Sequence, residues 1–144
     1  MKNRNGFRRG ALLAALLLPI SPVLADDLTG AQTLICAARE IHACTAGAGC
    51  AKVDPADLNV PDFLVVDLAA RQLRTTPASG ENRTSAIQLI SRDSGLLFLQ
   101  GVDNGRAWSF LIDEEGGSLT VSVARETLSV SAFGTCTPLP AAKP

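Results

Sequence analysis

The chain has 144 residues and a formal net charge of −1 at neutral pH, which is the length of one domain and shows no excess of basic residues. Nucleic acid and anionic membrane surfaces are bound chiefly through Lys and Arg, so neither is expected as a partner. With one Trp and no Tyr, the chain also offers no aromatic platform on which bases could stack.

The first 25 residues have the pattern of an export signal. Four basic residues within the first nine positions precede an apolar run from Ala11 to Ile20, and Val23-Leu24-Ala25 suits cleavage after Ala25. The sequence therefore predicts a signal peptide at 1–25 and a single periplasmic β domain at 26–144. That domain keeps nine basic and 14 acidic residues, a formal charge of −5. No other stretch approaches the ~18 apolar residues of a membrane-spanning helix, so membrane insertion is not expected.

The four cysteines are Cys36, Cys44, Cys50 and Cys136, and an even number in a small exported chain predicts two disulfides. Cys44 and Cys50 flank a short run of small residues that can bring them together, which leaves Cys36 to pair with Cys136. The long bridge would tie the first strand to the last, as expected if a meander closes on itself. A metal site is the alternative to this pairing, but the sequence has no Cys-x-x-Cys pair and only one histidine.

Residues 33–44 are ambiguous, because their apolar positions fit a helical stripe and also alternate as in a strand. We favour the strand. Asp54 to Pro61 is expected to be a turn-rich connection with one helical turn at Pro55 to Leu58. Phe63 to Leu68 and Ala70 to Thr75 are expected to form a hairpin, followed by a loop up to Arg83.

The turn at Asn104-Gly105 sets the strand register in the second half of the chain, since Asn-Gly between two apolar runs is a strong hairpin signal. It places four pairs opposite one another: Asp103 and Arg106, Gly101 and Trp108, Leu99 and Phe110, and Leu97 and Ile112.

Three further turns extend this register. A loop from Glu114 to Gly117 would oppose Ile112 to Leu119, a loop from Ala124 to Thr127 would oppose Val123 to Leu128, and a three-residue turn at Asp93 to Gly95 would oppose Leu89 to Leu99. Side chains alternate between the two faces of a strand, so one face is predicted to be buried throughout. Its members are Leu89, Leu97, Leu99, Trp108, Phe110, Ile112, Leu119, Val121, Leu128 and Val130.

These elements predict an all-β fold, an antiparallel meander of seven to nine strands that forms a small closed or nearly closed barrel. A two-layer β-sandwich is the alternative.

Three short motifs carry a resemblance: Asn59-Val60-Pro61-Asp62-Phe63-Leu64, Gly105-Arg106-Ala107-Trp108-Ser109 and Phe133-Gly134-Thr135-Cys136. In these segments the chain resembles small exported, disulfide-containing proteobacterial proteins of unassigned function. The resemblance implies a β-rich periplasmic protein and supplies no activity and no functional residues.

The sequence is compatible with three classes of function. The first is a binding or inhibitory module, without catalysis or cofactor, that contacts another envelope protein or a second copy of itself. Its predicted surface is an outward-facing apolar patch of Ile90, Phe98 and Leu111, unless residues 26–60 cover this patch. This class ranks first. The second is a barrel that carries a small apolar ligand; the large inner side chains are expected to fill the interior, and a dry cavity larger than ~300 Å³ would reverse the ranking. A hydrolase built on His42 and Glu40 is the third, and no serine motif accompanies that pair.

Overall fold

The computed structural model describes residues 27–79 and 81–139, so the predicted signal peptide and its cleavage site lie outside the described residues. Within this part the chain forms strands and two short 3-10 helices, η1 (Pro55–Leu58) and η2 (Pro77–Ser79). The strands are β1 (Thr33–Thr45), β2 (Gly49–Lys52), β3 (Leu64–Asp67), β4 (Gln72–Thr75), β5 (Thr84–Ala86), β6 (Leu89–Asp93), β7 (Leu96–Asp103), β8 (Arg106–Asp113), β9 (Ser118–Arg125) and β10 (Leu128–Pro138).

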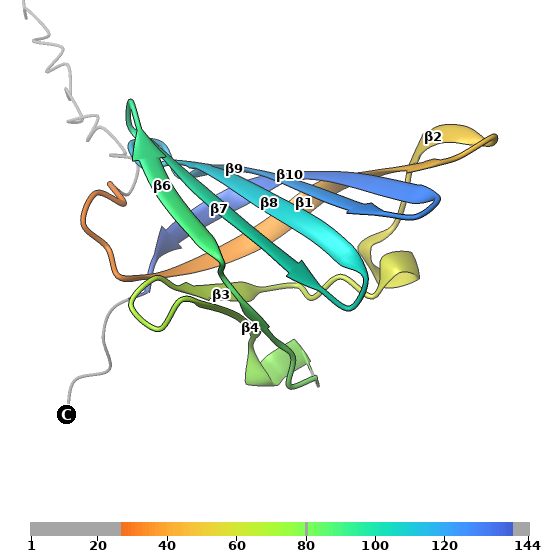
Figure 1. Ribbon diagram of the computed structural model, residues 1–144. Coiled ribbons are helices and arrows are strands. Elements are labelled where there is room, and N and C mark those ends of the chain that lie inside the picture. The colour runs from red at the N-terminus through yellow and green to blue at the C-terminus, as the bar shows by residue number, and fades with distance from the viewer. Residues whose placement is uncertain (1–26, 80, 140–144) are drawn as a thin grey trace, which may run out of the picture.

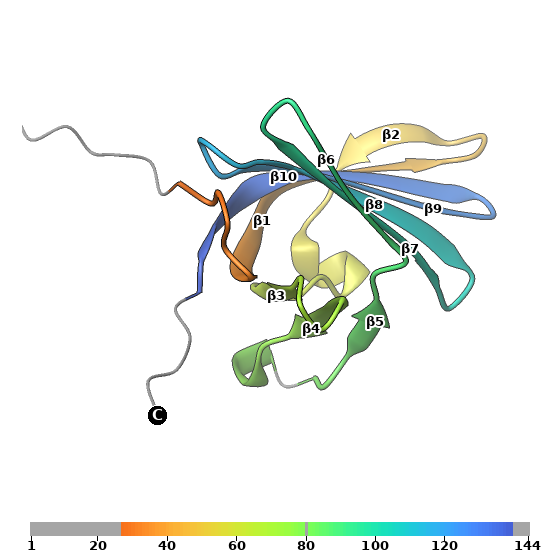
Figure 2. The same cartoon turned by 60° about the vertical axis from the view of Figure 1, so that its left-hand side comes forward.

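The strands form one antiparallel sheet in the order β5-β4-β3-β1-β10-β9-β8-β7-β6, with β2 attached to β1 beside this path. The sheet curls on itself, so that β3, β4 and β5 face the larger group of strands across the interior (Figures 1 and 2). The predicted all-β, nearly closed barrel is confirmed. The nine strands of the path agree with the predicted range, and β2 adds one more because the segment after Cys44 forms a hairpin.

A single extended segment joins the two ends of the sheet. Its first part, β5, pairs with β4, and its second part, β6, pairs with β7. Between them the Ile87 amide donates to the Arg71 carbonyl at 2.8 Å, and the Gln88 amide donates to the Gln100 carbonyl at 2.9 Å. The same segment therefore forms both end strands of the path and brings the two ends of the sheet together.

The first long strand pairs with the last, and a disulfide crosses this pairing. Cys36 on β1 lies opposite Cys136 on β10 and is bonded to it, while Cys44 is bonded to Cys50 across the β1–β2 hairpin. Both predicted disulfides and the predicted strand at 33–44 are confirmed. Two disulfides are typical of proteins that fold outside the reducing cytoplasm.

The register around the Asn104-Gly105 and Glu114–Gly117 turns agrees with the prediction pair by pair. The pairing of β9 with β10 differs by two residues. Arg125 lies opposite Leu128, so the turn contains only Glu126 and Thr127, and Val123 faces Val130 instead of Leu128. A shift of two residues keeps every side chain on its predicted face, because the alternation has a period of two.

The register of β6 was predicted wrongly by one residue, and this slip reverses its faces. The turn contains only Ser94 and Gly95, both with positive φ, so Ile90 instead of Leu89 lies opposite Leu99. Ile90 packs against the core, whereas the Leu89 side chain is 48% exposed. A two-residue turn with left-handed residues matches the twist of a hairpin better than the predicted three-residue turn.

One end of the barrel is closed by the segment that precedes β1. Leu28 is 1% exposed within the core, and its amide donates to the Glu114 carbonyl at 2.8 Å. The largest side chains with almost no exposure in the same core cluster are Leu34, Val66, Leu97, Leu99 and Ile112. The core is therefore densely filled toward this end, and the opposite end holds the site described next.

Candidate functional site

A cavity of about 200 Å³ opens at the end of the barrel away from Leu28. Its wall is mostly apolar, and six strands and the connection before β3 contribute the following apolar side chains: Ala38, Ile41, Val60, Pro61, Leu64, Leu73, Trp108, Phe110, Leu119, Val121, Val123, Val130 and Ala132. Polar side chains line it at four positions, Thr75, Arg83, Ser85 and Arg106. An apolar space with a few polar groups at its rim is typical of a binding site for a small molecule.

Trp108 combines two roles in this wall. Its ring lies over Gly101, the residue opposite it on β7, and meets the Phe110 ring edge to face with centroids 5.5 Å apart. The side chain is 8% exposed, and no polar atom among the described residues accepts a hydrogen bond from its Nε1. A buried indole N–H normally has a partner, so the cavity wall contains an unused donor.

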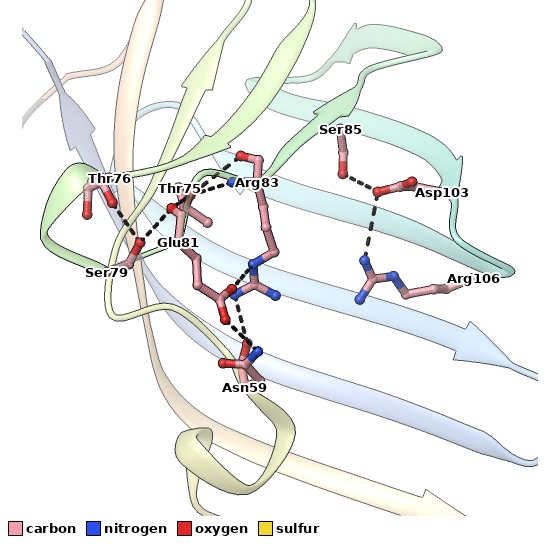
Figure 3. A network of polar contacts seen from close by, with 9 residues as sticks. All are labelled: Asn59, Thr75, Thr76, Ser79, Glu81, Arg83, Ser85, Asp103 and Arg106. Carbon is pink, nitrogen blue, oxygen red and sulfur yellow. Dashed lines mark hydrogen bonds and ion pairs between the residues drawn. The ribbon is translucent and has the colours of Figure 1, made fainter.

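Arg83 on the rim is held by the loop it belongs to. Its Nε lies 2.5 Å from the Glu81 carboxylate, and its Nη2 donates to the Asn59 carbonyl at 2.9 Å. The Asn59 amide in turn donates to Glu81 at 2.9 Å, and Thr75 bonds to the backbone of Glu81 and Arg83 (Figure 3). This network ties β4 to the start of β5 and gives the Arg83 guanidinium one hydrogen bond and one close ion pair.

Arg106 has no comparable set of partners. Among the residues that the structure describes, its only partner is Asp103, with Nη2 and Oδ2 3.8 Å apart, which is longer than a hydrogen bond. Asp103 instead accepts a hydrogen bond of 2.6 Å from the Ser85 hydroxyl. Figure 3 shows Arg83 within the network around Glu81 and Asn59, and Arg106 apart from it with a contact to Asp103. The Arg106 guanidinium therefore has no hydrogen-bond partner in the described part of the chain.

The predicted patch of Ile90, Phe98 and Leu111 is not assembled. Phe98 and Leu111 lie opposite each other on the outer face, as predicted, and both are half-buried. Ile90 faces the interior because of the one-residue slip in β6. The outer row continues in the other direction instead, through Thr120 to Phe133, whose side chain is 47% exposed.

His42 and Glu40 lie on the outer face of β1, as a strand reading requires. His42 Nε2 is 2.7 Å from the Glu40 carboxylate, and this hydrogen bond, assisted by the charge of Lys52, lowers the Glu40 pKa below its ordinary value. Ser131 lies opposite His42 in the sheet, but no hydrogen bond joins the two in the described structure. The pair sits on an open sheet face, which supplies neither a bound substrate position nor oxyanion donors.

The rim arginines were not identified as a site from the sequence. Arg106 precedes Trp108 by two residues, so the alternation already placed both on the inner face. This alternation could have identified Arg106 as a residue of the barrel interior, but the sequence analysis used Arg106 only as the partner of Asp103 beside the turn. Arg83 reaches the cavity through a loop whose path the sequence does not encode by any periodic pattern.

The described part of the chain, 27–79 and 81–139, contains no group of three side chains placed to hold a metal ion. None of its helices is long and apolar enough to cross a membrane. Comparison with protein-family models, curated proteins and solved structures found no match to this chain. The resemblance to small exported proteobacterial proteins therefore stays a prediction.

Proposed function

We propose that this is a periplasmic protein that binds a small apolar ligand in the open end of its barrel. The observation that carries the proposal is the apolar cavity of about 200 Å³ beside Trp108, with polar groups confined to its rim. Side chains such as Leu97, Leu99 and Ile112 fill the interior near Leu28. At the other end the wall includes small side chains such as Ala38 and Ala132.

The volume limits the ligand. It is smaller than the ~300 Å³ that was set for a carrier and at which drug-sized pockets begin, so the proposal is restricted to a smaller ligand. A short alkyl chain with its polar end at the rim fits this space, whereas a polycyclic ligand does not. The expected ligand is therefore small, and its affinity will be correspondingly modest.

The single tryptophan offers a direct measurement, because Trp108 lines the cavity and no other indole contributes. Titration with butanol, hexanol and octanol should change its emission in a saturable way. Each methylene that enters the cavity should tighten binding about fourfold, from ~0.8 kcal/mol per buried methylene.

A variant that fills the cavity provides the control. Ala132→Leu adds volume to the cavity wall and should abolish the titration, whereas Ala124→Leu on the exposed outer face of β9 should leave it unchanged. Both variants should keep their β-sheet circular dichroism. If the Ala132→Leu protein bound the three alcohols as tightly as the unchanged protein does, the cavity would be ruled out as the site.

A second function is favoured by a different observation. The outer row places Phe98 and Leu111 side by side on β7 and β8, and the exposed Phe133 of β10 follows beyond Thr120 of β9. Apolar groups that are contiguous on a surface are typical of protein contacts. We propose as the second candidate that this row contacts another envelope protein or a second copy of the chain.

A further inference from the structure

We propose that the ligand of the barrel carries a carboxylate, and that Arg106 binds it. This inference rests on the proposed function and names the chemical class of its ligand. It begins from Arg106, which lines the apolar cavity and has no hydrogen-bond partner among the described residues. Arg106 has only a distant ion pair, and Trp108 Nε1 has no acceptor among the described residues.

The two carboxylates near the rim already have partners. Asp103 accepts from the Ser85 hydroxyl at 2.6 Å, and Glu81 accepts from the Asn59 side-chain amide and pairs with Arg83. A ligand whose polar end only accepts would find the Arg106 guanidinium open to it.

The guanidinium favours a carboxylate among such acceptors. Its N–H groups form a planar fork that matches the two carboxylate oxygens, and charge-assisted bonds of this kind are about twice as strong as neutral ones. Arg106 is 36% exposed and stands at the edge of an apolar cavity, so the charge pair forms where water is partly excluded. The alkyl chain of the ligand would then lie along Trp108 and Phe110.

Asp103 works against this ligand and therefore supplies a test. Its carboxylate stands 3.8 Å from Arg106, so it lowers the attraction that Arg106 exerts on an incoming anion. Replacing it by Asn keeps an oxygen that accepts from Ser85 and removes the competing charge. If Arg106 and Asp103 only supported the structure, replacing either residue should change carboxylate binding in the same direction. The proposal predicts that replacing Arg106 weakens carboxylate binding and that replacing Asp103 strengthens it.

The experiment compares octanoate with octanol by titration calorimetry on the mature chain at low salt, since the two probes differ only in the polar end. The expected result is that octanoate binds at least tenfold more tightly than octanol and loses affinity as salt is added. Arg106→Gln should remove that preference and leave octanol binding within twofold. Asp103→Asn should strengthen octanoate binding severalfold without affecting octanol.

Two further variants test which arginine binds the carboxylate. Arg125→Gln, at an exposed strand end outside the cavity, should retain the preference. Arg83 is the other arginine that lines the cavity, so Arg83→Gln tests whether its guanidinium binds the carboxylate in place of Arg106. Loss of the preference in Arg83→Gln but not in Arg106→Gln would overturn the assignment.

The outcomes distinguish the inference from the function beneath it. Equal binding of octanoate and octanol would overturn the carboxylate and leave the apolar site standing. Binding of neither probe would overturn both. Trp108 emission that changes with protein concentration before any probe is added would show that a second copy occupies the mouth, which would also overturn the proposal.

Discussion

The indole of Trp108 occupies the space in which a Cβ atom at position 101 would lie. Such an atom would overlap the ring, at 2.6 Å from Cε2, and would also stand 2.8 Å from the Ala86 carbonyl oxygen on β5. An aromatic ring that covers a cross-strand glycine is a known way to fix register in curved sheets. Here the ring also forms part of the cavity wall, so the contact links sheet register to the proposed site.

Gly101→Ala should displace this ring. We expect a loss of about 1 to 3 kcal/mol in the free energy of unfolding, which is the range for overpacking a filled interior. The emission of Trp108 should shift to longer wavelength as the ring becomes more exposed. Gln100→Ala, at an exposed position of the same strand, should change the free energy of unfolding by less than about 0.5 kcal/mol. An unchanged Trp108 spectrum in Gly101→Ala would contradict the contact.

The two disulfides should differ in what they contribute. The Cys36–Cys136 bond spans 100 residues of sequence, whereas the Cys44–Cys50 bond spans six. On the chain-entropy model, removing the long bridge should cost about 4 to 5 kcal/mol and removing the short one about 2 kcal/mol. Denaturant unfolding of the Cys36→Ala/Cys136→Ala and Cys44→Ala/Cys50→Ala proteins measures both, and a larger loss from the short bridge would contradict this order.

The sequence predicted the strand pairing correctly where the residues of a turn specify its type. Asn104-Gly105 fixed the pairing of Asp103 with Arg106 and of the residues beyond them, because both residues accept positive φ. The β6–β7 turn was missed because Ser94 adopts a left-handed φ of 52°, which a serine does not signal. Asp93-Ser94-Gly95 therefore fits a two-residue or a three-residue turn equally, and the two choices give opposite faces for Leu89 and Ile90.

The cavity was beyond the reach of the same reasoning. Its volume depends on the two-residue shift between β9 and β10, which places Val130 opposite Val123 and Ala132 opposite Val121. It depends also on Val60, Pro61 and the Arg83 loop, whose approach to the barrel mouth follows from tertiary packing. Alternation assigns a residue to the inner face but does not say how completely the inner faces fill the space between them.

The Glu40 carboxyl should titrate below its ordinary pKa of 4.5, because His42 donates a hydrogen bond to its charged form and Lys52 adds a favourable charge. A pKa that is lowered on folding stabilises the folded state above the unfolded value, and this contribution is lost as the pH falls through the folded pKa. Carbon-13 NMR of the carboxyl should show the midpoint returning toward its ordinary value in His42→Ala, and to a smaller extent in Lys52→Gln. A midpoint unchanged by His42→Ala would contradict the hydrogen bond as the main cause.

Ile90 and Phe98 should respond differently to substitution by serine, although the sequence placed them in one patch. Ile90 packs against the core opposite Leu99, so Ile90→Ser should cost about 2 to 4 kcal/mol in the free energy of unfolding. Phe98 lies in the outer row with Leu111, and Phe133 of the same row is 47% exposed. If this row contacts a second copy of the chain, Phe98→Ser and Phe133→Ser should keep the melting temperature and lower the sedimentation coefficient at high protein concentration. Unfolding of the Phe98→Ser protein would show that Phe98 is part of the core, and it would remove the outer row as an interface.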